Sequence, residues 1–240
     1  MVWIPTLLLL SSMTTLPTSS NPRLPVLDAR LAAAAAYVRP GHPAADIGCD
    51  HGKLSAWLAG SGRCPRVFAC DLRPDPLEKA RRRCQPWADR VDCRLGSGLE
   101  VLSPDEADDI IIAGMGAETI LDILDAAPWV ADGRYNLVLV PATKHSLLRL
   151  GLARRGFALL DETLAEAAGR WYSVMNARYD GRHHTPDGWF CLTGKTPGQP
   201  GFAAYCAQQY PKLKKYRLGL APGPEAESVD ALIQRLEELL

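Results

Sequence analysis

From about residue 27 onward, short apolar runs alternate with segments of helical periodicity. The apolar runs predict strands over 44–48, 66–71, 90–95, 109–113 and 136–140. Between them, apolar positions three and four residues apart predict helices over 27–38, 53–59, 74–84, 118–125 and 146–155. Strands that are apolar throughout and separated by helices indicate a parallel sheet covered on both faces.

Two further strand-like runs, 157–165 and 170–179, follow with no helix between them. Their connection at Ala168-Gly169 is too short for a parallel crossover, so this pair must be antiparallel. A doubly wound parallel sheet closed by an antiparallel hairpin is the outline of class I methyltransferases, and plain dinucleotide-binding folds usually lack that hairpin. The expected fold is therefore α/β, with a Rossmann-like parallel sheet of the class I methyltransferase type.

The C-terminal part shows a different pattern. Residues 196–201 are rich in Pro and Gly and predict a linker. Helical periodicity over 202–217 and 225–240, around a Pro- and Gly-containing turn, predicts an antiparallel α-helical hairpin. We therefore expect one domain over 26–195 and a helical hairpin over 196–240.

The first 25 residues do not share this organisation. They contain no Lys or Arg before Arg23, and their apolar run over 3–10 is too short to span a bilayer. A signal peptide needs a basic start and a small-x-small cleavage site, and the stretch is poor in both. We interpret 1–25 as a disordered leader or a start assigned too early, with Met13 as another candidate, in preference to an export signal. No other segment has the length and apolar character of a membrane span.

The overall composition excludes several classes of protein. With 47% hydrophobic and 22% charged residues, the chain is neither disordered, collagen-like nor a dedicated coiled coil. The 27 basic and 27 acidic side chains give zero net charge, which by itself indicates no particular partner. The seven cysteines include no CxxC pair, so neither a metal site nor a disulfide framework is expected. Buried thiols of this kind favour a reducing, cytoplasmic compartment.

Residues able to bind a ligand gather where the predicted strands end, which is where open parallel sheets bind ligands. Asp46, Gly48 and Gly52 follow the first strand. The glycines let the backbone approach a ligand, and the carboxylate suits the ammonium group of S-adenosylmethionine (SAM). The GxGxxG dinucleotide fingerprint is absent. A simple turn is the alternative.

The loops at the ends of the following strands complete a predicted nucleoside site. Asp71 ends the second strand, where a carboxylate accepts the ribose hydroxyls, although a helix cap before Pro74 is an alternative role. Gly96-Ser97-Gly98 would form the wall against the adenine. Gly114 and Met115 would form the floor beneath the transferring methyl group. These four loops together predict SAM as the cofactor, bound by residues of all of them: Asp46, Gly48, Gly52, Asp71, Gly96, Ser97, Gly98 and Gly114.

Three of these segments resemble the TrmK family, SAM-dependent tRNA methyltransferases that modify N1 of adenine 22. The matching motifs are Asp-Ile-Gly-x-Asp-His-x-x-Leu over 46–54, Gly-x-Gly-Leu over 96–99 and Ile-Ala-Gly-Met-Gly over 112–116. The resemblance extends from about Leu27 to the C-terminus, including Gly-Arg-Trp-Tyr over 169–172 and the helical hairpin. It implies methyl transfer from SAM to an adenine of tRNA.

The chain departs from that family at three places. The family usually has Asp where Ser97 stands and Gly where Ala117 stands. Its fifth strand typically ends Leu-Gln-Pro-Asn, and here Val140-Pro141-Ala142 keeps only the proline. Two polar groups expected to face the substrate base are thereby absent.

The catalytic candidates are Asp50, His51 and Met115. N1 of neutral adenine carries a lone pair and needs no strong base, so placement and tolerance of positive charge determine the rate. We expect Asp50 to stabilise positive charge and His51 to hydrogen-bond the base or orient Asp50. The alternative for His51 is a loop residue bonded to backbone.

Binding of tRNA requires cations, and the predicted hairpin carries a cluster of them. Lys212, Lys214, Lys215 and Arg217 lie on its first helix, near two tyrosines, and are our candidates for phosphate contacts. A solvated helix face is the alternative interpretation. Two other functions stay open: a methyltransferase for a small molecule or protein, and a non-catalytic SAM-fold protein that binds RNA.

Overall fold

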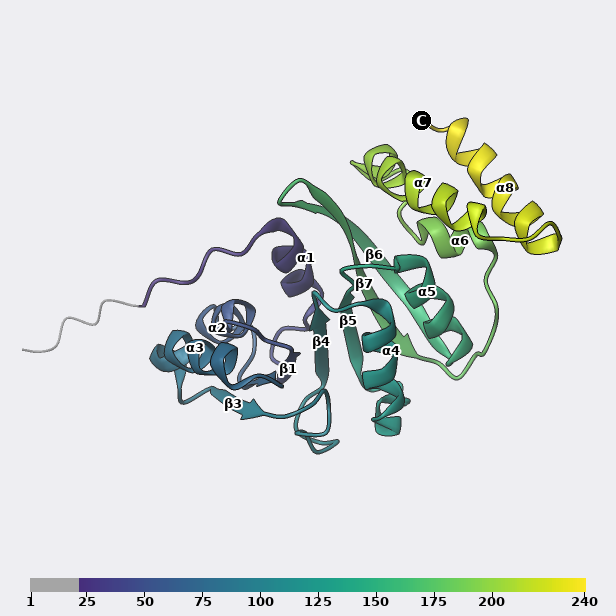
Figure 1. Cartoon of the computed structure of the whole chain (residues 1–240). Coiled ribbons are helices and arrows are strands. Elements are labelled where there is room, and N and C mark those ends of the chain that lie inside the picture. The colour runs from purple at the N-terminus through teal and green to yellow at the C-terminus, as the bar shows by residue number, and fades with distance from the viewer. Residues whose placement is uncertain (1–21) are drawn as a thin grey trace, which may run out of the picture.

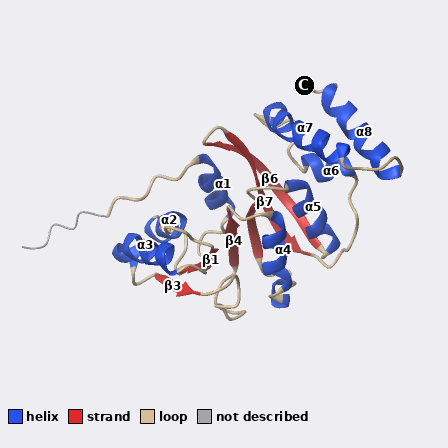
Figure 2. Cartoon of the chain, in the orientation of Figure 1, coloured by secondary structure: helices blue, strands red, loops and turns tan. Residues whose placement is uncertain are grey.

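The computed structural model describes residues 22–240 and is built around one sheet (Figures 1 and 2). Residues 1–21 of the expected leader lie outside the described residues. In the described part, seven strands lie in the order β3-β2-β1-β4-β5-β7-β6. Their bounds are β1 Ala44–Ile47, β2 Val67–Asp71, β3 Val91–Leu95, β4 Asp109–Ala113, β5 Asn136–Val140, β6 Phe157–Ala167 and β7 Arg170–Tyr179.

Strand β7 runs antiparallel to both of its neighbours, β5 and β6, while β1 to β5 pair in parallel. The predicted parallel sheet with a closing antiparallel hairpin is therefore confirmed. The order reverses at β1, which pairs with β2 on one side and with β4 on the other. The loops after β1 and β4 consequently diverge, and this switch point opens a crevice for a ligand.

Helices cover both faces of the sheet (Figure 2). One face carries α1 (Ala29–Tyr37), α2 (Lys53–Gly60) and α3 (Pro74–Cys84), and the other carries α4 (Ala117–Asp125) and α5 (His145–Arg154). Successive residues of β4 enter opposite cores: Ile110 and Ile112 pack under α4 and α5, and Ile111 packs under α1 and α2. Burial on both faces explains why this strand is apolar throughout its length.

The sequence-predicted elements are all present, with bounds that differ by at most about three residues. The pattern did not predict the short helix α6 (Gly188–Thr193) or the 3₁₀ turns Gln85–Trp87 and Pro128–Val130. The predicted helical hairpin consists of α7 (Phe202–Leu218) and α8 (Pro224–Glu237). It packs beside β6 and β7 around a third core, formed by residues of four elements: Leu164, Leu192, Tyr205, Cys206 and Leu236.

The segment 196–201, which its composition predicted to be a linker, packs against the sheet domain. Thr196 is fully buried. The side-chain amide of Gln199 donates to the carbonyl of Glu162 at 2.6 Å, and its oxygen accepts from the Leu164 N–H at 3.0 Å. These bonds attach the segment to β6, so the expected boundary at 195/196 runs through packed chain.

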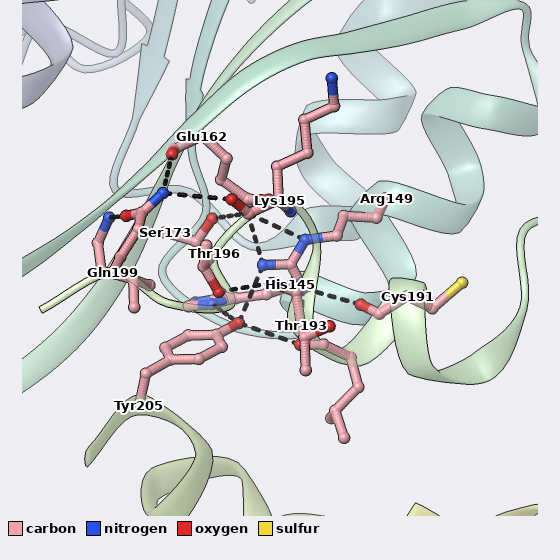
Figure 3. Close-up of polar contacts among 12 residues, drawn as sticks. His145, Arg149, Glu162, Ser173, Cys191, Thr193, Lys195, Thr196, Gln199 and Tyr205 are labelled. Atoms are coloured by element: carbon pink, nitrogen blue, oxygen red, sulfur yellow. Dashed lines mark hydrogen bonds and ion pairs between the residues drawn. The ribbon is translucent and has the colours of Figure 1, made fainter. Parts of the chain in front are cut away.

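A buried polar network also joins the helical part to the sheet (Figure 3). Arg149 of α5 donates from Nε to Glu162 of β6 at 3.0 Å and from Nη2 to the Tyr205 hydroxyl of α7 at 3.1 Å. Its Nη1 donates to the carbonyls of Cys191 and Leu192 in α6 at 2.8 and 2.9 Å. One guanidinium therefore ties α5, β6, α6 and α7 together.

Candidate functional site

A cavity of about 550 Å³ opens at the carboxyl ends of the strands on both sides of the switch point. Its volume is in the range of small-molecule sites. Six of the eight residues predicted to bind SAM line it: Gly48, Asp71, Gly96, Ser97, Gly98 and Gly114. Asp46 lines an adjoining cavity of about 320 Å³, which shares Arg30, Gly48, Asp50 and Ala113 with the first. Gly52 lines neither cavity and packs against Ala80, where it precedes α2.

Asp71 is a buried carboxylate at the cavity wall, 5% exposed. Its two oxygens accept the backbone N–H groups of Asp50 at 3.0 Å and Arg73 at 2.9 Å. These bonds fix the loops after β1 and β2 relative to each other. Since a carboxylate oxygen has two acceptor positions, Asp71 keeps capacity for further donors. The next residue, Leu72, lines the cavity with 67% of its surface exposed, so the wall offers an apolar surface beside a charged acceptor.

Asp46 is buried at the end of β1 and accepts a hydrogen bond from the Ser55 hydroxyl at 2.6 Å. Burial raises the pKa of Asp46 to about 6, opposed by the Ser55 bonds and reinforced by the charges of Asp71 and Asp50. A buried carboxylate next to other acids is stabilised in its ionised form by a cation. The position therefore suits a ligand that carries an ammonium group.

Two glycines bring the backbone close to the cavity. Gly48 has φ +72°, and a Cβ there would lie 2.2 Å from Cε of Met115. Gly114 has φ +85°, and a Cβ there would lie 3.3 Å from Nη1 of Arg30. Both positions require the left-handed conformation that glycine adopts without strain. Met115, predicted to lie below the methyl group, lines the first cavity and packs over Gly48.

Asp50 and His51 lie within contact distance of each other but differ in the cavities that they line. Asp50 is exposed at φ +49°, lines both cavities, and lies 3.6 Å from the Arg73 guanidinium. His51 lines the second cavity, with Nε2 3.7 Å from Asp50 and 3.4 Å from Nζ of Lys79. Asp50 thus faces both spaces. The catalytic roles of both residues stay predictions.

Sequence reasoning missed Arg30, a cation of α1 that lines both cavities. Its guanidinium carbon lies 5.3 Å from the ring centre of Tyr172, which fixes its position by a cation–π contact. Arg30 precedes the first strand, where no strand-end pattern points to it. Only the packing of α1 against the sheet brings it to the cavity.

The four cations of α7 do not share one environment. Lys214 donates to the Tyr210 hydroxyl at 3.1 Å and lies 4.0 Å from Glu237, and Arg217 donates to Asp230 at 2.7 Å. Both therefore contact acidic side chains of α8. Lys215 is exposed. Lys212 bonds Gln209 at 3.4 Å on the side of the helix toward the sheet domain.

Residues 22–240 meet the requirements of neither a metal site nor a membrane-spanning helix. No group of three or more His, Cys, Asp and Glu side chains there is arranged to hold a metal ion. No helix in this part of the chain has the length and apolar character required to cross a bilayer.

Comparison with known proteins identifies the family. The methyltransferase-domain family matches residues 27–175. The tRNA (adenine(22)-N(1))-methyltransferase of Bacillus subtilis is 33% identical over 174 residues, which are 72% of this chain and 73% of that protein. The crystal structure of the B. subtilis M1A22 tRNA methyltransferase TrmK superposes with TM-score 0.75 at 27% identity, covering 90% of this chain and 98% of that one.

A Streptococcus pneumoniae protein solved in complex with S-adenosyl-L-methionine has the same fold, with TM-score 0.77 at 23% identity over 89% of this chain and 99% of that one. The expected Rossmann-like methyltransferase fold and the expected resemblance are both confirmed. The chain belongs to the class I methyltransferases and, within them, to the TrmK family of tRNA (adenine(22)-N(1))-methyltransferases.

Proposed function

We propose that this protein transfers the methyl group of SAM to N1 of an adenine in tRNA, with adenine 22 as the expected position. The observation that carries the proposal is the pair of buried carboxylates, Asp46 and Asp71, in adjoining cavities at the switch point of a TrmK-family sheet. We place the reaction in the cytoplasm, where the tRNA substrate is found.

The residues of the two cavities fit SAM chemically. Asp71 offers carboxylate acceptors for the ribose hydroxyls, and exposed Leu72 offers an apolar surface for the adenine ring. Asp46 suits the ammonium group, and Arg30 suits the carboxylate at the same end of the molecule. Ser97, exposed at the first cavity, retains a hydroxyl where the family usually has Asp.

When bound, SAM supplies a methyl group on a positively charged sulfur. The adenine N1 lone pair forms the new C–N bond as the C–S bond breaks, and the sulfur keeps the electron pair. The positive charge moves from sulfur to the methylated base. The protein therefore has to align donor and acceptor and to stabilise positive charge near the β1 and β4 loops. Asp50 is the exposed carboxylate that faces both cavities there.

The loop after β5 borders the acceptor side of this space. The Ala142 N–H donates to the Met115 carbonyl at 2.8 Å, which holds the Val140-Pro141-Ala142 segment against the β4 loop. This segment lacks the polar side chains that the family usually places there. We propose that backbone groups of the loop position the base instead.

The proposal is tested with unmodified tRNA transcripts, the full chain and methyl-labelled SAM. We expect label in tRNA, 1-methyladenosine after nuclease digestion, and a reverse-transcription stop at position 22. A transcript with guanine at position 22 is the matched control and should receive no label. Transfer to free protein or small molecules instead, or RNA binding without transfer, would replace the proposal with one of the two alternative functions.

A further inference from the structure

Two cations lie where the catalytic sheet meets the helical hairpin. Arg170 is the first residue of β7, and Lys212 lies in α7. Arg170 donates from Nη2 to the Ala142 carbonyl at 3.4 Å, and its guanidinium carbon lies 5.7 Å from the ring centre of Tyr172. Ala142 in turn bonds Met115, a residue of the first cavity. Arg170 therefore lies beside the substrate end of the site.

The relative position of these two cations is fixed by paired hydrogen bonds between α7 and β7. The Trp171 N–H donates to Oε1 of Gln208 at 2.8 Å, and Nε2 of Gln208 donates to the Trp171 carbonyl at 2.8 Å. Trp171 follows Arg170, and Gln208 lies four residues, about one helical turn, before Lys212. Deeper in the junction, Tyr205 of the same helix is bound to Arg149. The hairpin thus holds Lys212 at a defined place next to the sheet.

The positive charge at this junction is not neutralised by the protein. Among the ion pairs of residues 22–240, Lys214 and Arg217 have acidic partners on α8, and none includes Arg170 or Lys212. Partial burial of the ammonium and then the charge of Arg170 lower the pKa of Lys212.

A neighbouring histidine reports the same electrostatic environment. Burial, followed by the charges of Arg149, Lys212 and Arg170, lowers the pKa of His145 to about 3. His145 is therefore neutral at pH 7 and adds no charge of its own. Arg149 is already paired with Glu162, which leaves Arg170 and Lys212 as the exposed positive charges of this junction.

Two cations that repel each other at an open surface are stabilised by a bridging anion. We infer that Arg170 and Lys212 form a phosphate-binding site for the RNA backbone that flanks the target base. This inference rests on the proposed function for its ligand, an RNA strand that passes over the junction of hairpin and sheet. It also assigns the α7 cations different roles: Lys212 contacts RNA, whereas Lys214 and Arg217 stabilise the hairpin.

The test compares Arg170→Gln and Lys212→Gln with Lys214→Gln in the full chain. Lys214 is the matched control because it lies two residues from Lys212 on the same helix and already contacts α8. Binding of an unmodified tRNA transcript is measured by fluorescence anisotropy over a range of salt concentrations. We expect Arg170→Gln and Lys212→Gln each to weaken binding about 3- to 10-fold and to reduce the salt slope by about 1, with a smaller effect of Lys214→Gln.

Two controls separate RNA contact from damage to the fold. Arg170→Lys keeps the charge but loses the planar fork, so it should retain most of the tRNA affinity. SAM affinity by calorimetry should stay at the wild-type level in all variants, and the melting temperature should stay at the wild-type level in the Arg170 and Lys212 variants. Wild-type tRNA affinity in both Gln variants, or losses equal to that of Lys214→Gln, would overturn the inference.

The outcome is independent of the test of function. If wild-type protein methylates tRNA and the Gln variants bind it normally, the function stands and the phosphate site is wrong. If wild-type protein transfers no methyl group to tRNA but loses RNA affinity in the Gln variants, the phosphate site stands and the proposed function is wrong.

Discussion

The guanidinium of Arg149 and the carboxylate of Glu162 form an ion pair in which neither side chain is exposed, with Nε 3.0 Å from Oε1. The hydroxyl of Ser173 and the backbone N–H of Lys195 also donate to this carboxylate. Because a buried charge without a partner is far more costly than an exposed one, the pair governs how the helical part docks on the sheet.

Removing the charge of Glu162 should therefore destabilise the protein strongly. We expect Glu162→Gln to lower the free energy of unfolding by about 3–5 kcal/mol, because the guanidinium of Arg149 stays buried without its counter-ion. Urea denaturation followed by circular dichroism measures the change. Asp125→Asn is the control, since it breaks the half-exposed pair with Arg155 and should cost at most about 1 kcal/mol. Equal effects of the two substitutions would contradict this account.

The carboxylate of Asp71 should be essential for cofactor binding. Hydrogen bonds between a carboxylate and the ribose hydroxyls contribute about 1.5–3 kcal/mol each, so Asp71→Ala should weaken SAM binding by about 100-fold or more. Titration calorimetry measures the affinity. Asp75→Ala removes an exposed carboxylate four residues later, in the first turn of α3, and should leave SAM binding unchanged. Undiminished affinity of Asp71→Ala for SAM would contradict the assignment.

Sequence patterns predicted the sheet well because its strands are local apolar runs buried on both faces. Ile110, Ile111 and Ile112 enter two different cores, and no alternation is needed to recognise such a strand. The strand-end residues followed from the same argument, because parallel strands bring their carboxyl ends to one edge. Asp46 and Asp71 therefore line adjoining cavities at this edge of the sheet.

Local sequence patterns did not predict the contacts between segments that are distant in the sequence. Glu162 follows a β-bulge between Leu159 and Asp161, which shifts the alternation of buried and exposed positions along β6. Its partner Arg149 lies on a different element, and no local rule connects them. The Pro- and Gly-rich segment 196–201 was predicted as a linker for the same reason, since its anchoring bonds from Gln199 reach β6. Which α7 cations are neutralised depends on the acids of α8.

Binding of SAM should depend on pH through Asp46. Its pKa in the folded protein is about 6, so the carboxyl takes up a proton below that pH, and the proton competes with the ammonium group of SAM. We expect the dissociation constant to be constant above about pH 7 and to rise by up to about tenfold per unit below pH 6. Calorimetry between pH 5 and 8 measures this dissociation constant.

Two variants distinguish Asp46 from other titrating groups. Asp46→Asn should bind SAM weakly with little pH dependence, and His51→Gln should keep the wild-type pH dependence. In the ligand-free protein, Asp46 changes folding stability with pH in the direction opposite to that of a carboxyl group whose pKa is lowered on folding. The folded pKa lies above the ordinary value of 3.8, so this group's contribution to stability falls as the pH rises from about 4 to about 6.

The close approach of Met115 to Gly48 gives the last prediction. Both Gly48, at φ +72°, and Gly41, at φ +81°, require left-handed backbone, so either glycine-to-alanine substitution should lower stability by about 1–2 kcal/mol. A Cβ at Gly41 meets nothing within 4 Å, whereas a Cβ at Gly48 would lie 2.2 Å from Cε of Met115. Gly48→Ala should therefore also displace Met115 and weaken SAM binding, whereas Gly41→Ala should leave binding intact.

Adding Met115→Ala to Gly48→Ala removes the clashing group and should restore part of the affinity. Calorimetry of the three variants checks the prediction, and equal SAM affinity in Gly48→Ala and Gly41→Ala would contradict it.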